Sequence, residues 1–148
     1  MSTGTIVALS ISETKGTPKL NVPTVVMLPE WGIEGDAHAG NWHRQVSLLP
    51  MESVAKMQQL GATVTAGSFA ENITTLGIDL SQLQIGDLVS IENVRLEITQ
   101  IGKECHARCN IYYQVGDCVM PREGIFARVL TGGTVSVGSP IKVDHSKS

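Results

Sequence analysis

Short runs of alternating or β-branched apolar residues dominate the chain, and Gly, Asn, Asp or Pro separates most of them. Such runs, bounded by turn-forming residues, are typical of strands. In one run Val94, Leu96 and Ile98 share a face, because side chains alternate along a strand with a period of two. The predicted strands cover residues 5–9, 22–28, 45–49, 71–75, 87–91, 94–100, 126–130, 134–137 and 141–143. Pro23 places the 22–28 strand at a sheet edge.

A helix is predicted over residues 51–60, because apolar residues recur there at helical spacing. Pro50 suits the first helical turn, and Gly61 suits a left-handed C-terminal cap. The expected apolar stripe consists of Met51, Val54, Met57 and Leu60. A short helix or turn over residues 110–115 is a second candidate.

Many short strands with one or two peripheral helices predict a mainly β fold, a closed or nearly closed β-barrel with mostly antiparallel strands. The alternative is a parallel α/β fold, which needs more crossover helices than the chain offers. With 148 residues, 42% hydrophobic and 17% charged, the chain suits one globular domain over residues 1–143 and not a disordered protein. Residues 144–148 are expected to form a flexible tail.

Charge and hydropathy narrow the range of partners. The net charge of −3 argues against a nucleic-acid partner held by phosphate contacts. No run approaches the ~20 apolar residues of a membrane-spanning helix, so no membrane partner is expected. The N-terminus lacks the basic region of a signal peptide, which favours a cytoplasmic protein with reduced cysteines.

Reactive and charged residues are concentrated in glycine-containing segments, as in loops that carry function on a rigid scaffold. These segments cover residues 32–45, 67–73, 102–109 and 116–124. His38 and His43 suggest acid–base or metal chemistry, although loop histidines bonded near the surface explain them equally well. Arg44 and Arg122 suit an anion clamp, because guanidinium binds phosphate or carboxylate in a bidentate fashion. The alternative for either arginine is a solvated surface charge.

Cys105 is the candidate nucleophile. Lys103, His106 and Arg108 surround it in sequence, and positive charge stabilises a thiolate, the form that attacks sulfur centres and ligates soft metals. The alternative is a buried cysteine that acts as a small apolar residue. Zinc is a competing hypothesis, but the four possible ligands lack the two separated pairs of a structural zinc site. They are Cys105, His106, Cys109 and Cys118.

Taken in order, motifs along nearly the whole chain resemble the MOSC domain, named for the C-terminal domain of molybdenum cofactor sulfurase. The resemblance is closest to the small stand-alone members of that family. The motifs are GDAHAG at 35–40, HRQVSL at 43–48, GSFAENI at 67–73, LQIGD at 83–87, LEITQIGKECH at 96–106, MPREGIFARV at 120–129 and GG at 132–133.

This resemblance implies a barrel similar to that of pyruvate kinase and a pocket for the molybdenum cofactor, molybdopterin. It also implies a cysteine that carries sulfur as a persulfide or ligates molybdenum. That cysteine maps onto Cys105, with Cys109 as its rival. The motif residues implied to bind the cofactor are His38, His43, Arg44, Glu71, Asn72, Lys103, His106 and Arg122. We expect their segments to converge on one cleft.

Two classes of function follow from the resemblance. The first is an enzyme, either a sulfur transferase acting on the molybdenum cofactor or a component of a molybdenum-dependent oxidoreductase like the amidoxime-reducing relatives. The second is a non-catalytic cofactor carrier. Full-length cofactor sulfurases carry a pyridoxal phosphate-dependent domain, which 148 residues cannot contain. The expected partners are therefore the cofactor, a separate cysteine desulfurase as sulfur donor and a molybdoenzyme as acceptor.

Overall fold

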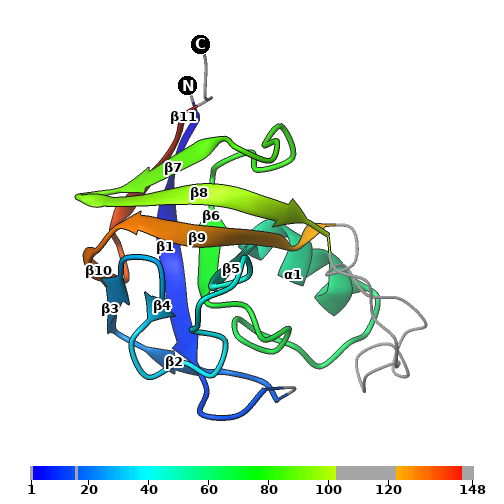
Figure 1. Cartoon of the computed structure of the whole chain (residues 1–148). Coiled ribbons are helices and arrows are strands. Elements are labelled where there is room, and N and C mark those ends of the chain that lie inside the picture. Colours follow the sequence, from blue (N-terminus) through cyan, green and yellow to red (C-terminus); the bar gives the residue numbers. More distant parts are fainter. Residues whose placement is uncertain (1, 16, 103–122, 145–148) are drawn as a thin grey trace.

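The structure is a computed structural model that describes residues 2–15, 17–102 and 123–144. An eight-stranded sheet closes on itself because β1 also pairs with β11, so seven strands form a barrel and β2 extends its edge (Figure 1). Around the barrel the order is β1, β11, β7, β8, β9, β5, β6. The strands of this sheet are β1 (Ser2–Ile11), β2 (Leu20–Val22), β5 (Val46–Pro50), β6 (Ile73–Leu76), β7 (Leu88–Ile91), β8 (Val94–Ile101), β9 (Ile125–Thr131) and β11 (Pro140–Asp144).

Strand pairing confirms the predicted mainly β, mostly antiparallel barrel. The pair β5–β6 is parallel, and the other described pairs are antiparallel. A parallel pair needs a crossover connection, and helix α1 (Met51–Gln59) lies in the chain between these two strands.

A second sheet contains β10 (Gly133–Ser136), β3 (Thr24–Leu28) and β4 (Gly32–Ile33). The sequence predicted one strand over residues 22–28, but the chain divides it at Pro23. Residues before Pro23 pair with β1, and those after it pair with β10. Proline has no N–H to donate to a ladder, which accounts for a break at this position.

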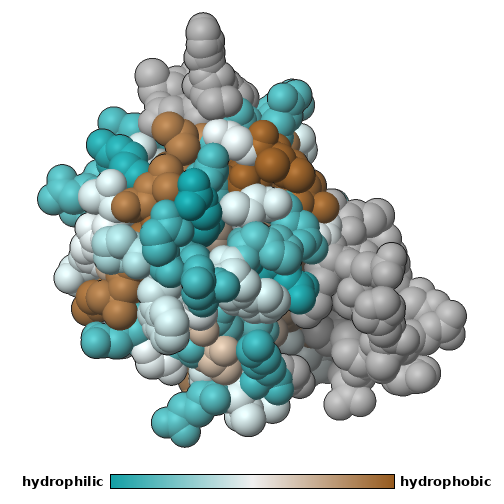
Figure 2. Space-filling model, in the orientation of Figure 1, coloured by the Kyte–Doolittle hydropathy of each residue, from teal (hydrophilic) through white to brown (hydrophobic). Residues whose placement is uncertain are grey.

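Aliphatic side chains fill the barrel. The predicted alternation in β8 is confirmed, because Val94, Leu96 and Ile98 are fully buried whereas Arg95 is exposed. On the face drawn in Figure 2, the described surface is mostly hydrophilic or mixed, and apolar residues reach it in a few groups. The barrel is therefore a packed core rather than a channel.

Helix α1 packs against the outside of the barrel. Val54 and Met57 are fully buried in a second apolar cluster that also contains Leu49, Phe69 and Phe126. Leu60, predicted to complete the apolar stripe, is instead 57% exposed. It lies past the last helical turn as the C-cap, where the chain turns away at Gly61, whose φ is +102°.

Among the described residues, no helix is long and apolar enough to cross a membrane. The candidate helix at residues 110–115 and residues 145–148 of the predicted tail lie outside the described residues.

Candidate functional site

A buried ion pair fixes the start of the loop that carries His38, His43 and Arg44. Lys19 Nζ donates to Asp36 Oδ1 over 2.7 Å, and both side chains are fully buried. The Asp36 carboxylate also accepts from the backbone N–H groups of Ser12 and His38, each over 3.1 Å. A buried carboxylate with this many donors is satisfied, so it holds residues 36–38 in one place against β1 and β2.

Trp42 is the centre of the loop. Its Nε1 donates to the backbone oxygen of His38 over 2.7 Å, and the His38 ring stacks beside the indole with centroids 6.5 Å apart. Two cations lie over the same indole: Lys15 Nζ is 4.8 Å from the ring centroid and Arg44 Cζ is 4.7 Å from it. The electron-rich face of the indole attracts both cations, so two positive charges lie close to Trp42.

Arg44 is held between two aromatic rings. Its Cζ lies 5.6 Å from the centroid of the Phe126 ring, in addition to its contact with Trp42. Its Nε atom is buried and has no hydrogen-bond partner among the described residues. A buried donor without an acceptor costs about 1–3 kcal/mol, so the Arg44 Nε–H is a donor that an additional acceptor at this place would stabilise.

His43 links this loop to the end of β8. Its Nε2 lies 2.8 Å from Oε1 of Gln100, and the Thr99 hydroxyl donates to the backbone oxygen of His43. Gln100 also donates from Nε2 to the Gly102 oxygen over 2.9 Å. Gly102 N donates to Gly124 O over 2.7 Å, so the described chain on either side of residues 103–122 meets beside His43.

Glu71 and Asn72 are fully buried, and their polar atoms bond within the protein. Glu71 accepts from the N–H groups of Gly67 and Phe69 and from the Thr74 hydroxyl. Burial raises the pKa of the Glu71 carboxyl, against the lowering effect of these hydrogen bonds. The geometry makes Glu71 a support for the 67–72 turn.

Asn72 ties three segments together. Its Oδ1 accepts from the Ser47 N–H over 2.9 Å, and its Nδ2 donates to the Ser10 oxygen over 3.1 Å. These bonds join β1, β5 and the start of β6, so Asn72 supports the scaffold behind the site. Direct cofactor contact by Glu71 or Asn72 stays a prediction.

The structure brings His38, His43 and Arg44 together around Trp42. The 67–72 segment lies next to this group of residues. Phe69 belongs to the same apolar cluster as Phe126, and the Phe126 ring also contacts the Arg44 guanidinium. The remaining predicted site residues lie outside the described residues, so their convergence on this site stays a prediction. They are Lys103, Cys105, His106, Cys109 and Arg122.

Sequence reasoning missed Trp42, Phe126 and Gln100. For Trp42 a signal existed, because aromatic residues make up only 4% of the chain and this one stands between His38 and His43. No sequence signal pointed to Phe126 or Gln100, since each residue lies within a predicted strand and has no unusual neighbours there.

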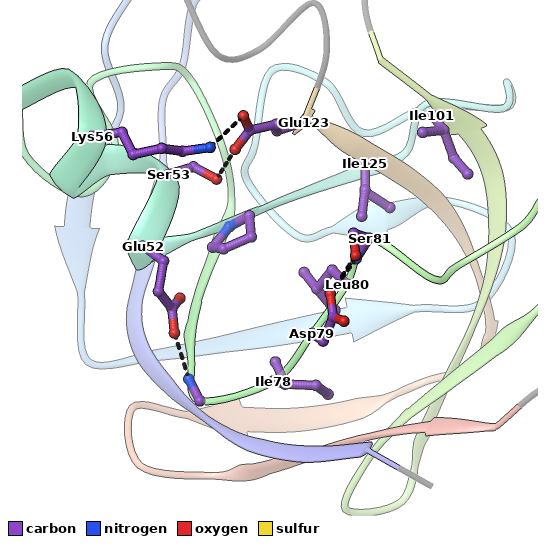
Figure 3. A pocket seen from close by; sticks show the side chains of 12 residues that line it. Glu52, Ser53, Lys56, Ile78, Asp79, Leu80, Ser81, Ile101, Glu123 and Ile125 are labelled. Atoms are coloured by element: carbon purple, nitrogen blue, oxygen red, sulfur yellow. Dashed lines mark hydrogen bonds and ion pairs between the residues drawn. The ribbon is translucent and has the colours of Figure 1, made fainter.

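A separate cavity of about 690 Å³ lies between α1, residues 77–81 and the adjoining ends of β8 and β9 (Figure 3). None of the predicted site residues that the structure describes lines it. The described residues also contain no group of three or more His, Cys, Asp or Glu that could hold a metal ion. The four candidate zinc ligands lie outside them.

Residues 35–142 match the MOSC domain family, and the chain therefore belongs to that family. Protein YiiM of Escherichia coli K12 is 24% identical over 155 residues, which cover 95% of this chain and 69% of YiiM.

Solved structures share the fold. The YuaD protein of Bacillus subtilis superimposes with a TM-score of 0.82 at 18% identity, covering 99% of this chain and 100% of YuaD. YiiM of Geobacillus stearothermophilus superimposes with a TM-score of 0.68 at 20% identity, and the match covers 95% of this chain and 74% of that YiiM chain.

Proposed function

We propose that this MOSC protein binds the molybdenum cofactor, with Arg44 holding the anionic phosphate of the cofactor and Cys105 carrying sulfur or ligating molybdenum. The observation that carries the proposal is the Arg44 guanidinium, held between Trp42 and Phe126 with a buried Nε that has no partner among the described residues. A phosphate oxygen is a suitable acceptor for that donor. The donor set therefore fits the cofactor.

The neighbouring residues suit the same ligand. Lys15 adds a second positive charge over the Trp42 ring, and neighbouring positive charges attract an anion. His38 and His43 present ring nitrogens whose positions are fixed by Trp42 and Gln100. We expect Lys103, His106 and Arg122 to complete the cofactor contacts, with Glu71 and Asn72 lining or supporting them. When bound, the cofactor supplies a molybdenum centre for sulfur ligation and redox chemistry.

Cys105 is the proposed sulfur-carrying residue because it follows Gly102 by three residues, and Gly102 is bonded to Gln100 beside His43. A thiolate at this position suits both hypotheses, since it can carry a sulfane sulfur or ligate molybdenum. In the sulfur-transfer form of the proposal a cysteine desulfurase is the donor and a molybdoenzyme is the acceptor. The expected compartment is the cytoplasm.

The test of the proposal is molybdenum and pterin analysis of the chain purified from molybdenum-replete cells. We expect both in a fixed ratio to protein. Protein that contains neither, from cells whose other molybdoenzymes are loaded, would contradict it.

A second measurement separates the enzyme from the carrier. Cys105→Ser and Cys109→Ser are compared for cofactor content and for sulfuration of an acceptor molybdoenzyme. Retained cofactor with lost sulfuration in Cys105→Ser alone supports sulfur transfer. Unchanged cofactor and unchanged sulfuration in both variants support the carrier.

A further inference from the structure

The cavity between α1, residues 77–81 and the ends of β8 and β9 has the size of a small-molecule site. Its volume of about 690 Å³ lies within the ~300–1,000 Å³ typical of ligand pockets. Ile78, Leu80 and Ile125 are each no more than 4% exposed and form an apolar floor. Figure 3 shows these side chains and the carboxylates of Glu52 and Asp79 around the same space.

The charged groups of the described lining residues are unbalanced. Lys56 is the basic residue among the described lining residues, and its Nζ donates to Glu123 over 2.6 Å. The Ser53 hydroxyl donates to the same carboxylate. Lys56 and Glu123 therefore neutralise each other, and the carboxylates of Glu52 and Asp79 remain without a cation among the lining residues.

Glu52 and Asp79 are exposed residues that line the cavity, whereas the apolar floor is buried. Asp79 accepts from the hydroxyl and the N–H of Ser81, which lowers the pKa of its carboxyl, so Asp79 is ionised at neutral pH. Glu52 uses Oε2 to accept from the Gly77 N–H over 2.9 Å. That bond fixes the Glu52 carboxylate at the rim, and a second acceptor oxygen stays on the same group.

We propose that this cavity binds a small organic cation, a primary alkyl- or arylalkylammonium ion. The apolar body would lie against Ile78, Leu80 and Ile125, and the ammonium group would donate to one of the two rim carboxylates, Glu52 or Asp79. The negative charge of the two carboxylates would repel an organic anion. None of the described lining residues belongs to the group around Arg44, so the proposal rests on other contacts than those argued for the cofactor.

The probes are phenethylammonium and 3-phenylpropanoate, which have similar shapes and opposite charges. Each is titrated into the full chain, and the methyl resonances of Ile78, Leu80 and Ile125 are followed by NMR. We expect phenethylammonium to shift these methyls and to bind at least tenfold more tightly than 3-phenylpropanoate. Raising the salt concentration should weaken the cation's binding, because exposed charges are screened.

Two isosteric variants test the carboxylates. Glu52→Gln and Asp79→Asn keep the acceptor oxygens for Gly77 and Ser81 and remove one charge each. We expect each to weaken phenethylammonium binding about two- to fivefold and the double variant about tenfold. Glu34→Gln, an exposed carboxylate on the β4 side of the molecule, is the matched control and should bind as the wild type does.

Equal affinity for the two probes would overturn the proposal. So would double-variant binding equal to that of the wild type, or methyl shifts absent from Ile78, Leu80 and Ile125. The titrations contain no cofactor, so their failure would leave the proposed function standing.

Discussion

The Nε2 atom of His43 lies 2.8 Å from the Oε1 atom of Gln100, although the two residues are 57 positions apart in the chain. This contact connects the loop around Trp42 with the C-terminal end of strand β8. Gln100 also donates to the Gly102 oxygen, so one side chain touches both the candidate site and the point where residues 103–122 begin. One side chain therefore joins the candidate site to Gly102.

A double-mutant cycle tests the contact between His43 and Gln100. His43→Ala and Gln100→Ala each remove the contact, while the Thr99 hydroxyl bond to the His43 backbone is retained. We expect a coupling of about 0.5 kcal/mol in the free energy of unfolding, the low end for a partly exposed hydrogen bond. Strictly additive effects in urea denaturation would show that the two side chains do not interact.

The Lys19–Asp36 pair should matter more to stability. Lys19→Met leaves the fully buried Asp36 carboxylate without its counter-charge, and breaking a buried pair in this way costs about 3–5 kcal/mol. The exposed Lys142→Met is the control and should change the free energy of unfolding by about 0.5 kcal/mol at most. A Lys19→Met effect no larger than the control would mean that the pair contributes little.

Glu71 predicts a pH dependence of stability. Burial raises its pKa above the usual 4.5, so between 4.5 and the raised value the folded chain binds more protons than the unfolded chain. The contribution of Glu71 to stability is then complete at low pH and falls as pH rises through that window.

The measurement is urea denaturation of wild type and Glu71→Gln at several pH values. Glutamine does not titrate, so the stability advantage of wild type over the variant should shrink as pH rises above 4.5. An advantage that grows over the same window would reverse the sign and contradict the raised pKa.

Cys105 should be the reactive thiol. If its neighbours stabilise the thiolate, its alkylation midpoint lies below the free-thiol value of about 8.5. The fast phase of alkylation should be absent from Cys105→Ser and present in Cys109→Ser. A midpoint at or above the free-thiol value, or loss of the fast phase in Cys109→Ser, would reassign the reactive residue.

Most of the barrel could be predicted because its strands are amphipathic or β-branched and end at turn residues. Val94–Ile101 is an example, since period-two burial follows directly from the residue order. The parallel β5–β6 pair could not be predicted, because pairing direction depends on the path of the chain through α1 and the following loop. The two-residue strand β4 was missed because Gly32–Ile33 carries too few residues for a period.

The candidate site was only partly predictable. Arg44, His43 and His38 are close in sequence, so the sequence alone indicated a site with a guanidinium and two imidazole groups. The contact of Arg44 with Phe126 depends on strand β9 lying next to β5, which no local pattern encodes. The cavity beside α1 could not be predicted from the sequence either, because its lining residues come from four separate segments of the chain.

The most direct test of the central claim is cofactor content as a function of Arg44. Wild type, Arg44→Lys, Arg44→Ala and Arg95→Ala are purified in parallel from molybdenum-replete cells, and molybdenum and pterin are measured per chain. Arg95, an exposed residue that donates to the backbone at the β7–β8 turn, is the matched control. A shielded bidentate contact contributes about 1.5–3 kcal/mol, so Arg44→Ala should weaken cofactor affinity about ten- to a hundredfold. Cofactor content should therefore fall in Arg44→Ala, fall less in Arg44→Lys and stay unchanged in Arg95→Ala. Equal cofactor content in Arg44→Ala and wild type would contradict the account.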